Sequence, residues 1–400
     1  MKSAPPCVLT INAGSSSIRF AVYAVAASLR PVLLGKIDRI GLKGTQLLVE
    51  RSAEKLPPRR SLAAADHRTA AGLLLDWLEA RPCFSRLRAV GHRVVHGMKH
   101  AAPERVRPAL VRELRRTIPY DPDHLPREIE LIAAIRRRHP QLPQVACFDT
   151  AFHRTMPRVA KLLAIPRRYA ADGVERYGFH GLSYTYLMEE LGRLDPKAAR
   201  GRVILAHLGN GASLAAVQRG RSVDTSMGFT PAAGLVMATR SGDLDPGLLA
   251  FLTRREQMTA AQFDRMVNHE SGLLGVSGTS SDLRDLLAAE GRARRAADAL
   301  ALFCYQARKW IGAYAAVLDG LDTLVFAGGI GENSAVIRQR ICARLGFLGL
   351  RLDRRRNARH AGIISVPGSR VTVRVIRTDE ELMIGRATVR LLRIAKLGRP

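Results

Sequence analysis

The stretch TINAGSSSIRFAVY, residues 10–23, begins and ends like a β-strand but carries one glycine and three serines at its middle. Glycine permits a tight turn, and small residues let backbone N–H groups approach an anion. The strand resumes instead of opening a helix, and GK[ST] is absent, so this is not a P-loop. The pattern predicts a hairpin that can face a phosphate, although an ordinary hairpin turn is the favoured interpretation when this stretch is taken alone.

A second stretch repeats this design in the other half of the chain. RVILAHLGNGASLAAVQRGRSV, residues 202–223, again places a Gly-rich polar turn and a serine between two apolar strands. Matching the two stretches aligns Ser17 with Ser213, and Asn210 is a residue type suited to the left-handed conformation. The repetition favours two domains of one ancestral design, each with a phosphate-facing hairpin.

Length and periodicity agree with an α/β protein of two domains. The chain has 400 residues, of which 47% are hydrophobic and 24% charged. Alternating segments predict antiparallel strands over 8–50, followed by a buried strand near 145. Helical spacing predicts helices over 61–81, 108–118, 126–138, 246–255, 259–269, 292–319 and 333–345, with a last helix at the C-terminus.

The net charge of +28 favours anionic small molecules as substrates. Basic residues are scattered and aromatic residues make up only 5%, which argues against nucleic acid as a specific partner. Five widely spaced cysteines without a CxxC motif indicate reduced thiols. No apolar run is long enough for a membrane span, and the N-terminus lacks a signal-peptide pattern, so we expect a cytoplasmic protein without a membrane partner.

Several further motifs place chemistry at predicted strand ends. GHRVVHG, residues 91–97, holds an arginine suited to bidentate binding of a carboxylate or phosphate, or to a buried ion pair. CFDTAFH, residues 147–153, puts an acid after a buried strand, and RYGFHG, residues 176–181, holds a histidine. VFAGGIGEN, residues 325–333, predicts a strand, a Gly-rich turn and a helix that starts near Asn333, an arrangement that suits a nucleotide.

The chain resembles the acetate/propionate kinase family of the actin-like ATPase superfamily. Ten motifs occur in the order seen in that family and span residues 8 to about 385: NAGSSS, GHRVVHG, FDTAFH, RYGFHG, HLGNGAS, DTSMGFTP, TRSGD, SGLLGVSGTSSDLRDL, GGIGENS and TDEEL. The resemblance implies two RNase H-like domains with mixed β-sheets flanked by helices and a cleft between them. It also implies ATP or ADP, Mg²⁺ (or Mn²⁺ in its place) and a homodimer. We expect residues 1–149 and 382–400 to form the acyl and phosphate domain, and 150–381 the nucleotide-binding domain.

The resemblance further implies a role for individual residues. The catalytic set would be Arg93, Asp149, His180 and Arg240, with Asn12 and Glu380 at the metal. The walls of the substrate pocket, which holds the small acyl group, would be Val95, Tyr120, Asp121, Phe179 and Pro231. The nucleotide would contact Asn12, Ser16, Arg19, His207, Gly209, Asn210, Gly211, Asp282, Arg284, Gly329, Ile330, Gly331 and Asn333.

Two segments depart from the family's pattern. IPYDPDHLP, residues 118–126, puts Asp121 where the family has a histidine and Tyr120 where it has an apolar residue. An acid beside a phosphate is repulsive unless it is paired, and His124 is a candidate substitute for the histidine. TDEEL replaces TNEEL, so Asp379 adds charge near the metal.

We therefore expect a kinase of a short carboxylate, acetate or alternatively propionate or another short-chain acid. The competing hypotheses are a non-catalytic ATP-binding protein of the actin superfamily and a basic protein that binds polyanions. A binding module has no need of a carboxylate clamp, which disfavours the former.

Overall fold

The computed structural model describes residues 4–14, 16–41 and 43–394. The chain forms two compact units, Met1–Ala151 together with Asp379–Pro400, and Phe152–Thr378. All five cysteines are free and buried. No helix among the described residues is both long and apolar enough to cross a bilayer.

The first unit is built on an eight-stranded mixed sheet in the order β5-β4-β3-β2-β1-β6-β8-β7. Strand β1 pairs antiparallel with β2 and parallel with β6, and β6 pairs parallel with β8. The strands are β1 (Cys7–Ala13), β2 (Ile18–Val25), β3 (Leu29–Asp38), β4 (Gln46–Ser52), β5 (Arg59–Ser61), β6 (Leu87–Val94), β7 (Glu104–Arg105) and β8 (Gln144–Phe148).

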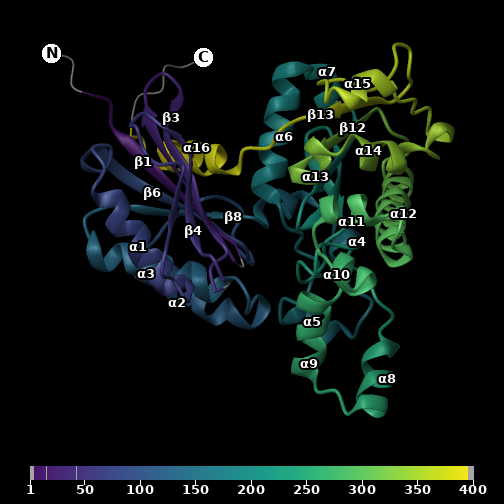
Figure 1. The fold of residues 1–400 in the computed structure, drawn as a ribbon, viewed down its shortest axis with the longest axis horizontal. Helices are drawn as coiled ribbons and strands as arrows, with labels where there is room; N and C mark the ends of the chain where they lie inside the picture. The colour runs from purple at the N-terminus through teal and green to yellow at the C-terminus, as the bar shows by residue number, and fades with distance from the viewer. Residues whose placement is uncertain (1–3, 15, 42, 395–400) are drawn as a thin grey trace. The chain divides into compact units, whose positions relative to one another are not determined.

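Helices cover both faces of this sheet (Figure 1). Alternate residues of β1, such as Leu9, join a core with α1 (His67–Glu79) and α3 (Leu125–Arg138). Helix α2 (Pro108–Thr117) packs with α3 over β6 and β8. Val8 points to the other face, where α16 (Glu380–Leu392) closes the layer through Val389. This period-two alternation makes β1 the centre of a three-layer arrangement.

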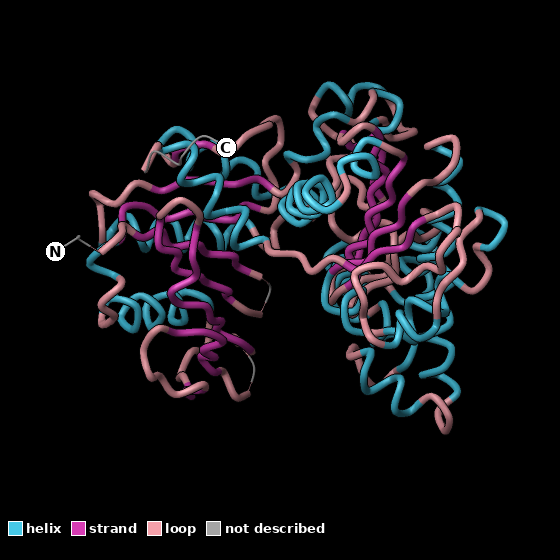
Figure 2. Tube along the Cα trace, turned by 90° about the horizontal axis from the view of Figure 1, so that it is seen from above, coloured by secondary structure: helices cyan, strands magenta, loops and turns pink. Residues whose placement is uncertain are grey.

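The second unit has a five-stranded sheet in the order β11-β10-β9-β12-β13. Its strands are β9 (Arg202–Leu208), β10 (Ala212–Gln218), β11 (Arg221–Thr225), β12 (Thr323–Ala327) and β13 (Thr372–Val375), drawn in magenta in Figure 2. Helix α6 (Gly181–Leu194) buries Leu187 and Leu191 in one core with β9 and β10. The long helix α12 (Arg294–Val317) also packs against β10.

Shorter helices complete the second unit. They are α4 (Arg158–Lys161), α5 (Arg167–Ala171), α7 (Pro196–Arg200), α8 (Gly247–Glu256), α9 (Ala260–Arg265), α10 (Gly272–Ser277), α11 (Leu283–Ala289), α13 (Gly328–Asn333), α14 (Ala335–Cys342) and α15 (Arg354–Ala358). The predicted helices over 246–255 and 292–319 are therefore confirmed to within two residues at each end.

The two sheets share one core topology. The order β3-β2-β1-β6-β8 in the first unit corresponds to β11-β10-β9-β12-β13 in the second, with the same parallel and antiparallel pairings. Both hairpins predicted from the sequence are present, as β1–β2 and β9–β10. This agreement supports the duplication that the repeated sequence pattern predicts.

Three local predictions are wrong. Ser17 lies in the first turn whereas Ser213 pairs within β10, because the first turn is one residue longer, and so the two serines are not equivalent. Asn210 is not left-handed, since the positive-φ residues do not include it. The Gly-rich stretch after β12 is not a turn but helix α13, which begins at once at Gly328.

Candidate functional site

Arg93 and Asp149 form a buried ion pair at neighbouring strand ends of the first unit. Arg93 lies near the end of β6, and Asp149 directly follows the parallel neighbour β8. The Arg93 Nε and Nη2 atoms donate to Asp149 Oδ2 at 3.1 and 2.6 Å, and the Asp149 side chain is fully buried. Burial opposes the charge of Arg93, but the neighbouring acids, first of them Asp149 and then Glu380, together outweigh burial and raise the arginine pKa. The guanidinium is thus permanently charged and fixed in direction.

Asn12, in β1, connects this arginine to two acids of α16. Its Nδ2 donates to Glu380 Oε2 at 2.9 Å and to Glu381 Oε1 at 3.3 Å, and its Oδ1 accepts from Arg93 Nη1 at 3.5 Å. Burial and the adjacent charge of Glu380 raise the pKa of Glu381 to about 7. The structure therefore brings the candidate residues Asn12, Arg93, Asp149 and Glu380 together, and it adds Glu381, to which the motif analysis gave no role.

The acids of this cluster offer only oxygen atoms as ligands, and oxygen ligands suit Mg²⁺. No group of three or more His, Cys, Asp or Glu side chains within the described part of the chain is arranged to hold a metal ion. Mg²⁺ usually keeps several waters and takes only one or two protein carboxylates, so the adjacent acids Glu380 and Glu381 fit it, while Asn12 presents its Nδ2 to them and its Oδ1 to Arg93.

The turn between β1 and β2 is held by its carbonyl groups. His67 Nε2 donates to the Gly14 carbonyl at 3.0 Å, and Ile40 N donates to the Ser16 carbonyl at 2.9 Å. Burial and the charge of Arg127 lower the pKa of His67, so its neutral form is favoured. Both carbonyls are therefore occupied by groups of the protein itself, which fixes the turn on its sheet.

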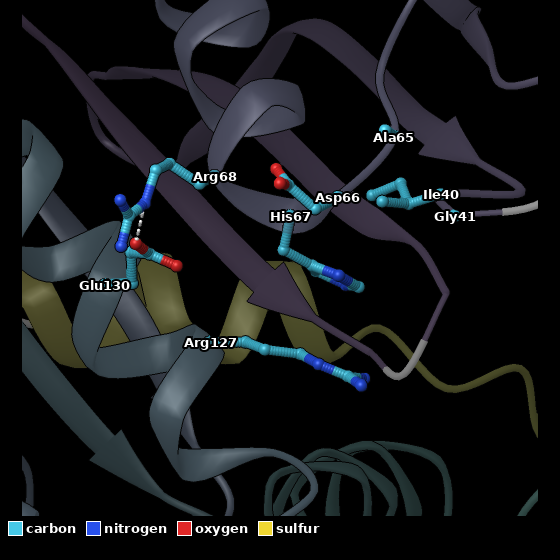
Figure 3. A pocket seen from close by; sticks show the side chains of 8 residues that line it. All are labelled: Ile40, Gly41, Ala65, Asp66, His67, Arg68, Arg127 and Glu130. Carbon is cyan, nitrogen blue, oxygen red and sulfur yellow. Dashed lines mark hydrogen bonds and ion pairs between the residues drawn. The ribbon is translucent and has the colours of Figure 1, made fainter.

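His67 also lines a cavity of about 430 Å³ beside this turn (Figure 3). Figure 3 shows the His67 ring and the Arg127 guanidinium pointing the same way, whereas Arg68 points elsewhere and pairs with Glu130. The lining residues are Ile40, Gly41, Ala65, Asp66, His67, Arg68, Arg127 and Glu130.

Arg19 lies opposite Asn12 in the β1–β2 ladder, so the two side chains share one face of the sheet. The Arg19 side chain is half exposed, and its Nη1 is 3.9 Å from Glu50. Its charge also acts to lower the pKa of Glu381.

The divergent segment 118–126 forms a turn with its own internal ion pair. Asp121 is 3% exposed, and its Oδ1 accepts from the His124 backbone at 3.2 Å and lies 2.9 Å from His124 Nδ1. Burial raises the pKa of Asp121, but the hydrogen bonds and charge of His124 outweigh it and lower that pKa. The Tyr120 ring packs against His96 with centroids 5.8 Å apart. The acid that the sequence flags as repulsive is thus balanced within its own turn.

Val95 follows β6 and is buried. Its backbone N–H donates to both carboxyl oxygens of Glu128, at 3.0 and 3.2 Å. The sequence analysis missed Glu128, although a glutamate on the apolar face of a predicted helix was a signal that could have identified it.

Two histidines, one in β9 and one at the start of α6, stack on each other at the hairpin of the second unit. His180 has φ 60° at the start of α6, its Nδ1 lies 2.8 Å from Ser213 Oγ, and its ring stacks on His207 at 4.2 Å. Ser183 Oγ in turn lies 2.8 Å from His207 Nδ1 and 2.8 Å from Thr378 Oγ1. Ser213 and Thr378 belong to the HLGNGAS and TDEEL motifs, whereas Ser183 lies outside the quoted motifs and reaches His207 from 24 positions earlier in the chain.

Gly211 brings the hairpin close to His180 and Arg240. A Cβ atom on Gly211 would lie 3.2 Å from His180 Nε2 and 3.7 Å from Arg240 Nη1. Arg240 lies in a loop, and the same Nη1 is 3.4 Å from the Pro231 carbonyl. Phe179, the residue before His180, is fully buried. The structure therefore places these predicted residues together within the second unit.

Helix α13 begins against the same hairpin. Gly328 has φ +75°, and a Cβ there would be 2.7 Å from the Leu208 carbonyl oxygen, so only glycine fits. A Cβ on Gly209 would lie 3.8 Å from Gly329 N. Gly329, Ile330, Gly331 and Asn333 are thus one helical turn beside the residues 209–211.

Asp282 and Arg284 form a pair at the start of α11. Asp282 accepts from the Arg284 backbone N–H at 2.8 Å and pairs with its guanidinium at 2.6 Å. The Arg284 side chain is 87% exposed. The contacts of this pair are local to α11, and they do not join it to α13.

Known proteins resemble this chain in sequence and in structure over nearly its whole length. The Acetokinase family matches residues 7–386. An acetate kinase of Methylocella silvestris is 43% identical over 397 residues, covering 96% of this chain and 98% of that protein. A propionate kinase of Citrobacter koseri is 43% identical over 393 residues, covering 96% of each chain. The crystal structure of Porphyromonas gingivalis acetate kinase has a TM-score of 0.86 at 37% identity, covering 97% of this chain and all of that one.

Proposed function

This chain belongs to the acetokinase family, and we propose that it catalyses the reversible transfer of the γ-phosphoryl group of ATP to the carboxylate of acetate. The observation that carries the proposal is Arg93, a permanently charged guanidinium held by buried Asp149 and next to Asn12. Such a group suits a carboxylate or a phosphoryl group, because both accept two parallel hydrogen bonds.

The acceptor needs orientation rather than activation. A short carboxylic acid has a pKa near that of glutamate, ~4.3, so it is already an anion at neutral pH. No general base is required to create the nucleophile. The barrier comes from bringing two anions together and from charge that spreads over the transferred group. Fixed positive donors address both, and each well-placed donor contributes roughly 2.7–4 kcal/mol.

On the first unit, Arg93 would hold the carboxylate, with Val95 and Tyr120 as walls for the acyl group. Asn12 and Glu380 would hold Mg²⁺, with Asp149 acting on it through water, and Ser16 and Arg19 would lie near the phosphates. When bound, Mg²⁺ neutralises phosphate charge during transfer. The raised pKa of Glu381 supports this assignment, because two adjacent carboxylates without a cation repel each other.

On the second unit, Arg240 and His180 would stabilise the phosphoryl group in the transition state. Gly211 supports this assignment, because its missing side chain leaves the backbone within reach of both groups. Phosphate contacts would come from His207, Gly209, Asn210 and Gly211. The adenosine would contact Asp282, Arg284, Gly329, Ile330, Gly331 and Asn333, and the residues of this unit assigned to the acyl group are Phe179 and Pro231.

Propionate is the second candidate acceptor. Relatives named propionate kinase match this chain at the same level of identity as those named acetate kinase. Tyr120 and Asp121 also differ from the family's usual apolar residue and histidine. A homodimer remains a prediction of the family resemblance.

The test is a substrate series with hydroxylamine trapping of the acyl phosphate. Acetate, propionate and butyrate would be compared at one fixed ATP concentration with Mg²⁺ present. We expect acyl hydroxamate from acetate, with propionate as the next best acceptor. Product from none of the three acids refutes the proposal, while a preference for propionate replaces the first candidate with the second.

A further inference from the structure

Helix α3 buries a single charged side chain among its apolar residues. Its buried face consists of Leu125, Glu128, Ile129, Leu131, Ile132 and Ile135. Glu128 is 2% exposed, and both of its carboxyl oxygens face the backbone N–H of Val95. A buried carboxyl group costs stability unless it is hydrogen-bonded, paired or neutral, so the surroundings of Glu128 decide its state.

Three charged groups act on Glu128 from the elements around it. Arg93 comes from β6, Asp121 from the turn before α3, and Asp149 from the end of β8. The remaining neighbour in this core, α2, contributes the apolar residues Leu110 and Leu114. Arg93 already pairs with Asp149, and Asp121 already pairs with His124.

Glu128 is therefore a third carboxyl group near one guanidinium, with a single N–H donor bonded to its two oxygens. Geometry of this kind favours the neutral acid, because the ionised form would add a negative charge at a buried site on which Asp121 and Asp149 already act. Burial is the largest cause, and it raises the pKa of Glu128 to about 8 although Arg93 opposes the shift.

We propose that Glu128 is a positioning residue for the carboxylate substrate: its neutral carboxyl group fixes the Val95 backbone and leaves the charge of Arg93 to the substrate. The inference rests on the proposed function, in which Arg93 binds that carboxylate. Ionised Glu128 would compete with the substrate anion for Arg93. Substrate binding then weakens in the pH range where Glu128 loses its proton. The phosphoryl transfer step changes less, because it also depends on the metal-holding residues and on Arg240 and His180.

The test compares the wild-type protein with Glu128→Gln from pH 6 to 9.5 at saturating ATP and Mg²⁺. Glutamine keeps an acceptor for Val95 N–H but stays neutral at every pH. We expect the wild-type KM for acetate to rise about tenfold between pH 7 and 9, with kcat changing less than about twofold. In Glu128→Gln the KM should stay flat. Glu113→Gln on α2, which removes a partly exposed carboxylate, is the matched control and should follow the wild type.

Parallel KM profiles in the wild type and Glu128→Gln would overturn the inference. A second variant, Glu128→Ala, removes the anchor of Val95 and should raise KM at every pH. If the variant instead keeps the wild-type KM at pH 7, Glu128 does not position the site.

Failure of the proposed function would be recognised separately, because the wild-type protein would then form no acyl phosphate at any pH. The state of Glu128 can still be read from thermal unfolding. A carboxyl group with a raised folded pKa contributes stability below its unfolded pKa, and loses it as pH rises through the folded value. The melting temperature of the wild type should therefore fall relative to Glu128→Gln as pH rises from about 4.5 to about 8. A constant difference over that range means that Glu128 is already ionised, and it too overturns the inference.

Discussion

The β1–β2 hairpin and the β9–β10 hairpin occupy the same place in two sheets of one topology, yet their surroundings differ in chemistry. Asn12 of β1 corresponds to His207 of β9, since each immediately precedes the strand residue whose pair closes the turn. Asn12 bonds acids and an arginine. His207 stacks on a second imidazole and bonds a hydroxyl.

This contrast separates what the backbone determines from what the side chains determine. The strand order places a turn at the end of the central strand in both units, and it does so whatever residue precedes the turn. Negative charge and a guanidinium then make the first end suited to a cation and a carboxylate. Imidazole and hydroxyl groups make the second end suited to phosphoryl oxygens.

The largest effect is expected from removing the arginine of either half. Arg93→Ala and Arg240→Ala should each reduce kcat by at least ~100-fold, because each removes a fixed positive donor. Arg93→Ala should also destabilise the first unit by about 3–5 kcal/mol, since it leaves Asp149 as a buried and uncompensated charge. Steady-state kinetics and urea unfolding of both variants measure the two effects.

The double variant Arg93→Ala/Asp149→Asn separates stability from catalysis. It removes the orphaned charge and should recover most of the lost stability without recovering turnover. Near-normal turnover in either single variant would remove that arginine from the catalytic set. If Arg93→Ala and Arg240→Ala have equal free energies of unfolding, the arginine of the first unit has no special role in stability, and the contrast between the two units is contradicted.

A smaller effect is expected from adding one methyl group to each turn. Gly211→Ala would put a Cβ 3.2 Å from His180 Nε2, so the ring must shift by a few tenths of an ångström. We expect kcat to fall about tenfold, because small displacements of a catalytic group are costly. Gly14→Ala meets Ser17 Oγ, also at 3.2 Å, but that hydroxyl can rotate away.

Gly14→Ala should therefore lower kcat by less than about threefold. If both variants lose activity equally, or Gly14→Ala loses more, then the first turn is the more constrained one and the contrast is reversed. Circular dichroism of both variants serves as the control for folding.

Much of this fold was accessible from the sequence because hydrophobic periodicity is a strong local signal. Both hairpins and most long helices follow from it. The errors fall where local signals are ambiguous. GGIGEN reads as a turn because glycine is a poor helix former, yet packing of Gly328 against Leu208 requires a residue without Cβ and carries the segment into a helix.

The site was accessible only in part. Arg93, Asp149 and His180 stand in recognisable motifs. Glu128 and Ser183 do not, because their roles come from contacts with residues far away in the chain. The turn at Asp121 shows the same limit. Its acid reads as repulsive until the fold pairs it with His124 three residues later.

The hydrogen bonds that hold the two turns offer a third test, for which the expected effect is smaller. His67→Ala removes the hydrogen bond to Gly14, and a bond of this kind contributes about 1 kcal/mol. We expect the KM for ATP to rise about fivefold with kcat nearly unchanged. His67→Gln, whose amide can donate to the same carbonyl, should recover most of the loss.

Ser183→Ala is the counterpart in the second unit, because it removes the hydroxyl that His207 Nδ1 contacts. We expect this variant to lower kcat rather than raise KM, since it loosens the imidazole stack. The same KM increase in both variants, or no rescue by His67→Gln, would show that the two turns are supported alike.

The smallest effect is an acid sensitivity of the first unit. His92 of β6 is 2% exposed, and burial lowers its pKa to about 4. Since the unfolded histidine titrates near 6.5, stability is full above that pH and is lost as pH falls toward 4. Between pH 6.5 and 5.5 the loss should be about 1 kcal/mol. Hydrogen exchange of the β6 amides, corrected for intrinsic rates, measures it. His92→Gln, which cannot titrate, should lose about 1 kcal/mol less protection over this step. An equal loss in both proteins would assign the acid sensitivity to other groups, because only the wild type carries the titrating ring in β6.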